Sequence, residues 1–93
     1  MSVAAVEAMA KTLTISLSPI RVNVISPYIV DTNLVGSGQT NEARAVFLKS
    51  TAESLPSKCS GSPKHIGNAA VFLMSNTYVT GSVLAVDGGF TLR

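Results

Sequence analysis

The stretch RVNVIS at residues 21–26 decides the fold, because it has the composition of a short strand with two apolar faces. Its β-branched residues and its stop before Pro27 are typical of a strand. Val22, Val24 and Ile25 place apolar side chains on both sides of this strand. Such a pattern is typical of parallel sheets, whose two faces are both covered by helices. The stretch therefore predicts a covered strand inside a layered fold.

A helix is predicted in front of this strand, over residues 2–18. Apolar residues recur along it at steps of three and four, at Val3, Val6, Ala10, Leu13 and Leu17. This spacing forms one apolar helix face. Pro19 ends the helix, because proline disfavours a helical conformation in the residue before it. The chain opens directly in this helix, and we therefore expect another part of the fold in front of it.

Two more helices and a second strand are predicted downstream. Asn41 is expected to cap a helix that runs from Glu42 to about Ser54. A proline suits the first position of a helix and begins the next one, which is predicted over 63–75. The second strand is SVLAVD at 82–87, which is flanked by glycines on both sides.

This order of elements places two parallel strands in one sheet, joined by a crossover that is expected to be right-handed. Two parallel strands are not stable alone, because the strand at 21–26 exposes a row of backbone donors and acceptors beside apolar side chains. The predicted fold class is therefore α/β. We expect the C-terminal part of a doubly wound, Rossmann-like fold, with two parallel strands and flanking helices.

Composition excludes several classes of function. Hydrophobic residues make up 46% of the 93 residues and charged residues 13%, so the chain is too apolar to be disordered. The net charge is only +2 and the basic residues are scattered, so no nucleic-acid partner is expected. No stretch approaches the ~20 apolar residues of a membrane span, and residues 1–17 lack the basic start of a signal peptide. A cytoplasmic protein without a membrane partner is predicted.

The single cysteine, Cys59, excludes an internal disulfide and fits a reducing cytoplasm. Cys59 and the only histidine, His65, are too few for a structural zinc site, which needs four ligands. We therefore predict no metal site and assign neither residue a catalytic role.

The loop PYIVDTNLVGSGQT at residues 27–40 contains two glycines, Gly36 and Gly38. A dinucleotide-binding fingerprint would need a third glycine at the position of Asn41, so the match fails. The two glycines are interpreted as a flexible hinge, and loops beside strand ends often act as lids.

Four motifs in order resemble the C-terminal portion of a classical short-chain dehydrogenase/reductase, over residues 2–93. They are Ala-Ala-Val at 4–6, RVNVISPYIVDT at 21–32, Gly-Ser-Pro at 61–63 and TGSVLAVDGG at 80–89. The resemblance implies an oxidoreductase that transfers hydride between NAD or NADP and a carbonyl or alcohol. It also implies a substrate-loop region over 33–55, which varies too much in the family to indicate a substrate.

The same resemblance places Val3 where the family has its catalytic lysine, and places the partner tyrosine of the Tyr-x-x-x-Lys motif before Met1. Neither Tyr28 nor Tyr78 is followed by lysine at the fourth position. The family's chemistry needs a tyrosine that moves a proton and a lysine that lowers its pKa. The glycine-rich turn that holds the pyrophosphate is also missing from the sequence. No catalytic residue is therefore expected, and the chain is predicted to be inactive alone.

The cofactor contacts implied by the resemblance fall in the loop after the first predicted strand. Pro27, Ile29 and Val30 correspond to main-chain contacts with the nicotinamide carboxamide. Thr32 corresponds to a hydroxyl that reaches the carboxamide or the phosphates. The residues alone also allow an ordinary strand-to-loop turn here. Tyr28 stands where the family has glycine, and tyrosine does not easily take the positive φ that glycine allows.

Two functions from different classes stay open, besides a remnant with no selected role. One is a segment of an NAD(P)-dependent oxidoreductase. The other is a non-catalytic oligomerisation or interaction fragment. The family's oligomers use the helix that resembles residues 2–18, and often the last strand and helix, as subunit contacts. The expected partner is therefore a second copy of this chain or a longer related chain.

Overall fold

The sheet of this protein consists, within the residues described by the computed structural model (3–28 and 41–92), of two parallel strands. The elements are α1 (Val3–Ser16), β1 (Val24–Pro27), α2 (Asn41–Ser54), α3 (Pro63–Ser75), β2 (Val83–Val86) and a 3-10 turn, η1 (Phe90–Leu92). The register pairs Val24 with Val83 and Pro27 with Val86. The predicted α/β class, with two parallel strands and flanking helices, is confirmed.

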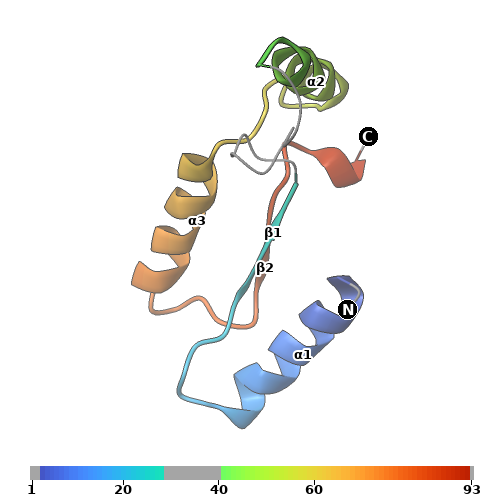
Figure 1. Ribbon diagram of the computed structural model, residues 1–93. Helices are drawn as coiled ribbons and strands as arrows, with labels where there is room; N and C mark the ends of the chain where they lie inside the picture. Colours follow the sequence, from blue (N-terminus) through green and yellow to red (C-terminus); the bar gives the residue numbers. More distant parts are fainter. Residues whose placement is uncertain (1–2, 29–40, 93) are drawn as a thin grey trace.

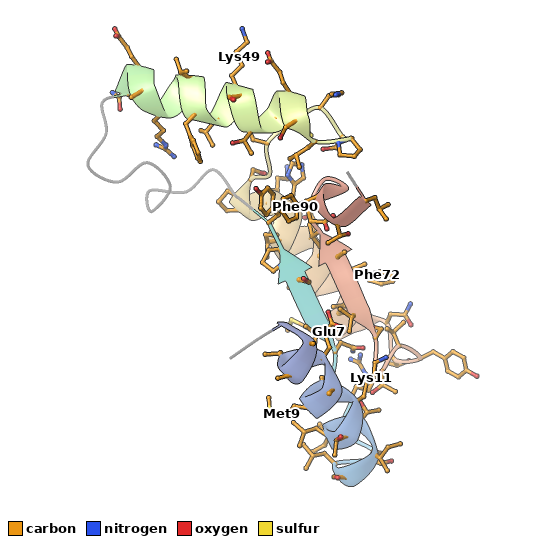
Figure 2. All side chains as sticks on the ribbon, turned by 90° about the vertical axis from the view of Figure 1, so that its right-hand side faces the viewer. Glu7, Met9, Lys11, Lys49, Phe72 and Phe90 are labelled. Atoms are coloured by element: carbon orange, nitrogen blue, oxygen red, sulfur yellow. The ribbon has the colours of Figure 1, made fainter. Side chains whose placement is uncertain are left out.

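The helices α1 and α3 lie on opposite faces of the strand pair (Figure 1). Figure 2 looks from the side of α1: both strands point upward, β2 stands to the right of β1, and α3 lies behind them. The connection from β1 through α3 to β2 is therefore left-handed, and the expected right-handed crossover is wrong. The right-handed rule describes a strand followed by one helix that packs straight back onto the sheet. Here the connection also contains α2, and α3 covers the face that α1 leaves open.

The ends of the helices differ slightly from the expected ranges. The helix expected over 2–18 is α1, which ends at Ser16. The chain turns directly after it, because the Ile20 N–H donates to the Leu17 carbonyl oxygen at 2.8 Å. Asn41, expected as the cap of the next helix, is itself the first residue of α2.

The strand β1 begins at Val24, later than the expected range of 21–26, and β2 is shorter than expected at both ends. Ahead of β1 the Gly81 N–H donates to the Val22 carbonyl oxygen at 2.7 Å, but the next N–H, that of Ser82, donates to a side chain instead of the backbone. The Asn23 side-chain amide donates to the Val79 carbonyl oxygen at 3.0 Å, and its Oδ1 accepts from the N–H and hydroxyl of Ser82 at 3.1 and 2.7 Å. Regular pairing starts only after this bridge.

Arg21 links the start of the first strand segment to the end of α3. One guanidinium nitrogen, Nη1, donates to the carbonyl oxygens of Leu73 at 2.6 Å and Val79 at 3.2 Å. The other, Nη2, donates to the Met74 carbonyl oxygen at 2.8 Å. The last carbonyls of a helix lack partners within the helix and carry partial negative charge. The cationic side chain of Arg21 therefore closes the carboxyl end of α3.

The hydrophobic core is small. Among the described residues only Ala10, Leu55 and Leu73 are buried. Large apolar side chains are exposed, such as Ile15 on α1 and Met74 on α3, which are 79% and 75% exposed. The Cα radius of gyration is 15.6 Å, where about 12 Å is typical of a compact domain of this length. The helices and strands therefore leave apolar surface uncovered.

Candidate functional site at the carboxyl end of the strands

Pro27 is the last residue of β1 and is exposed at the carboxyl end of the parallel strands. In open α/β sheets, ligands bind in the crevice outside the carboxyl ends of the strands. The structure therefore brings this predicted cofactor-binding residue to the edge where a ligand is expected. The other three predicted contacts, Ile29, Val30 and Thr32, lie outside the described residues.

Tyr28, which replaces the family's glycine, is accommodated without unusual backbone geometry. Its N–H donates to the Val86 carbonyl oxygen at 3.3 Å and extends the pairing of the two strands. Among the described residues other than glycine, only Lys58 has a positive φ, so Tyr28 does not need the conformation that glycine alone adopts easily. Its ring stacks on Phe90, with ring centroids 3.7 Å apart and planes inclined by 12°. Phe90 lies at the carboxyl end of the strands (Figure 2).

The double glycine after β2 forms a turn that only glycine fits. Gly88 and Gly89 have φ values of 63° and 88°, a region that other residues rarely adopt. A Cβ atom on Gly89 would lie 2.8 Å from Cγ of Pro56. The Ser57 N–H donates to the Gly88 carbonyl oxygen at 3.0 Å, and Leu55 is buried beside the turn. The segment after α2 therefore packs directly on this turn.

Asp87 holds the same turn from inside. Its carboxylate accepts a hydrogen bond from the Gly89 N–H at 2.9 Å and another from the Thr91 hydroxyl at 3.3 Å. The bond from the Gly89 N–H lowers the pKa of the Asp87 carboxyl below its ordinary value, because it stabilises the ionised form. The group is therefore ionised at neutral pH and acts as a fixed acceptor.

A cavity of about 390 Å³ opens beside the turn. Its apolar lining includes Tyr28, Leu55, Ile66 and Val86, and its polar lining includes Cys59, His65, Asn68 and Asp87. The imidazole Nδ1 of His65 accepts the Ser62 N–H at 2.9 Å and thereby caps the start of α3. Cys59 is an exposed free thiol. The Ser62 hydroxyl also lies 3.2 Å from His65 Nδ1, and this nitrogen is already engaged as the acceptor of the helix cap.

Residues 3–28 and 41–92 were compared with the requirements of a metal site and of a membrane-spanning helix. There, no three His, Cys, Asp or Glu side chains gather in a group that could hold a metal ion. None of the described helices combines the length and apolar character needed to cross a membrane.

Sequence reasoning missed two contacts at the carboxyl end of the strands, the stack of Tyr28 on Phe90 and the packing of Leu55–Ser57 on the double glycine. The available signal was the tyrosine in a glycine position. This signal indicated a local difference at Tyr28. The stacking partner, Phe90, is 62 residues further along the chain, and only the pairing of the two strands brings the two rings together.

Comparisons with known proteins agree with this geometry. The family model described as enoyl-(acyl carrier protein) reductase matches residues 1–91. The short-chain dehydrogenase/reductase ucsE of an Acremonium species is 40% identical over 86 residues, which cover 92% of this chain and 32% of that protein. Glucose 1-dehydrogenase 2 of Bacillus subtilis (strain 168) is 36% identical over 91 residues, which cover 94% of this chain and 34% of that protein.

A crystal structure of a small-chain dehydrogenase in complex with NADPH has the same fold in this region. The TM-score is 0.86 at 39% sequence identity, and the match covers 97% of this chain and 41% of that protein. The chain spans about a third of the length of the two curated relatives.

Proposed function

Because this chain belongs to the short-chain dehydrogenase/reductase family, we propose that it forms the C-terminal segment of an NAD(P)-dependent oxidoreductase domain. The observation that carries the proposal is the position of Pro27. It is exposed at the carboxyl end of a parallel strand, in a fold shared with a dehydrogenase that was solved with NADPH. When bound, NAD(P) accepts or donates the hydride, and the protein binds and orients it.

The residues that we propose for this task are Pro27, Ile29, Val30 and Thr32. The first three would contact the nicotinamide carboxamide through main-chain groups, and the Thr32 hydroxyl would donate to the carboxamide or the phosphates. The fit of Tyr28 supports this assignment, because its ring is turned onto Phe90 and Pro27 stays exposed. The side chain in the glycine position therefore does not cover the predicted contact.

Proton transfer depends in this proposal on residues outside these 93. The sequence contains no Tyr-x-x-x-Lys motif, and the described cavity offers no equivalent pair. We therefore propose that the 93-residue polypeptide alone does not turn over NAD(P) and works together with a preceding part of the fold. The single cysteine supports a location in the reducing cytoplasm.

A chimeric enzyme tests the cofactor assignment. The Bacillus glucose 1-dehydrogenase 2 keeps its own residues up to and including the position of Val3, and its own substrate loop at the positions of 33–54. Residues 4–32 and 55–93 come from this chain. We expect glucose-dependent NADH or NADPH formation, which the relative truncated after the position of Val3 lacks. Thr32→Val should raise the KM for the cofactor by about two- to tenfold, because one hydrogen bond is lost.

The matched control is Thr77→Val, because Thr77 is exposed on the connection between α3 and β2. This variant should leave the KM unchanged. A chimera that folds, as judged by circular dichroism, but forms no reduced cofactor would contradict the proposed function. If Thr32→Val and Thr77→Val had the same KM for the cofactor, the assignment of Thr32 to the cofactor site would be wrong.

The exposed apolar residues of α1 favour a second candidate, a non-catalytic interaction fragment. Ile15 is 79% exposed and Met9 is 47% exposed, and apolar surface of this kind often meets another protein. For this candidate we expect light scattering of the 93-residue protein to give the mass of two or more copies, and Ile15→Lys to shift it toward one. A monomer at all concentrations would rule the candidate out.

A further inference from the structure

One turn contacts both ends of the segment between Tyr28 and Leu55. At the first end, the ring of Tyr28 stacks on Phe90 at 3.7 Å. At the second end, Leu55, Pro56 and Ser57 pack against Gly88 and Gly89, and the Ser57 N–H donates to the Gly88 carbonyl oxygen. In the sequence these contacts involve three successive residues, 88–90. We call residues 87–90 the anchoring turn.

The anchoring turn is held by its own hydrogen bonds. The Phe90 N–H donates to the Asp87 carbonyl oxygen at 3.1 Å, and the Gly89 N–H donates to the Asp87 carboxylate at 2.9 Å. The turn continues directly from β2, which is paired along its length with β1. Phe90 is therefore presented from a fixed backbone, and its ring is only partly exposed.

We propose that Phe90 is a positioning residue for the cofactor. By stacking on Tyr28 it fixes the backbone directly after the predicted contact Pro27. The same turn fixes the exit of α2 through Leu55 and Ser57. Phe90 touches no reacting atom in this proposal, which rests on the proposed function.

The stack of Phe90 on Tyr28 is expected to increase the affinity for NAD(P), because it lowers the entropy cost of binding. A contact residue whose backbone is already fixed loses less conformational freedom when the ligand binds. Without the stack, that loss would weaken ground-state and transition-state complexes by the same amount. A change of this kind raises KM and leaves kcat nearly constant. Phe90 should therefore affect the affinity for NAD(P) and not the chemical step.

The chimera described above provides the kinetic test. Phe90→Ala should raise the KM for NAD(P) by about two- to tenfold, the range that corresponds to one lost aromatic pair. The kcat should stay within about twofold. Phe90→Tyr keeps an aromatic ring and should restore the parent KM. The matched control is Phe72→Ala on α3, a half-exposed phenylalanine on another element (Figure 2), which should leave KM unchanged.

A second measurement does not depend on activity. Amide hydrogen exchange followed by NMR compares two strand-pairing donors, the Tyr28 N–H and the Val24 N–H, which bond to Val86 and Ser82. Phe90→Ala should speed exchange at Tyr28 and leave Val24 unchanged. An inactive parent chimera would contradict the proposed function, while exchange still tests the anchoring. A parent-like KM, an equal effect of Phe72→Ala, or unchanged exchange at Tyr28 would overturn the role of Phe90.

Discussion

Replacing Gly89 with alanine is expected to lower the free energy of unfolding by about 2–5 kcal/mol, the sum of left-handed backbone strain and overpacking. Gly89 has a φ of 88°, and an added Cβ would lie 2.8 Å and 2.9 Å from two carbons of the Pro56 ring. A proline ring cannot rotate out of the way. The loss is large relative to the 5–15 kcal/mol that stabilise a typical domain. Urea denaturation of the chimera measures it.

Two other glycines provide the comparison for this variant. Gly88→Ala should cost less than Gly89→Ala, because its shortest contact, 2.6 Å, is to the hydroxyl oxygen of Ser57, which can rotate. Gly67 lies inside α3 with nothing within 4 Å of an added Cβ, so Gly67→Ala should stabilise the helix by about 0.5–1 kcal/mol. Equal stability of all three variants would contradict the close packing of Gly89 on Pro56.

Replacing Arg21 with methionine is expected to lower the free energy of unfolding by about 2–3 kcal/mol, because charged hydrogen bonds to the end of α3 are lost. Methionine keeps much of the aliphatic length and removes the guanidinium. Three carbonyl oxygens, those of Leu73, Met74 and Val79, then lose this donor. The variant should also lower the helix content in circular dichroism, because the last turn of α3 frays.

The control is Lys64→Met, which removes a positive charge from an exposed position in the first turn of the same helix. It should be neutral or slightly stabilising, because a cation is unfavourable near a helix N-terminus. Arg21→Lys should fall between the parent and Arg21→Met, since lysine keeps the charge but cannot span three carbonyls with a planar fork. An Arg21→Met protein as stable as Lys64→Met would show that the contacts contribute nothing.

The class of the fold could be predicted from the sequence because the spacing of apolar residues shows which side chains must be buried against another element. The two apolar faces of VNVI and the prolines at 19 and 27 indicated helix and parallel strand without any long-range information. The handedness of the connection from β1 to β2 could not be predicted from such patterns. It depends on which face α3 covers, and both faces of the strand pair accept an apolar helix.

The site could be predicted only in outline. Pro27 was placed at the carboxyl end of a strand by the motif that contains it, and the structure agrees on its position. The stack of Tyr28 on Phe90 depends on a side-chain direction and on the register of two strands. Local sequence encodes neither quantity. The double glycine of VDGG was recognised as a strand exit, but its close fit against Pro56 required coordinates.

The small core has a calorimetric consequence. The heat capacity of unfolding arises mainly from apolar surface that becomes hydrated, and only three described residues are buried. The 93-residue polypeptide should therefore melt over a wide temperature range, with an enthalpy well below the ~0.7 kcal/mol per residue of ordinary globular proteins. The same residues in the chimera, where further strands extend the sheet, should unfold in one sharp transition. The width of the transition therefore distinguishes the 93-residue polypeptide from the chimera.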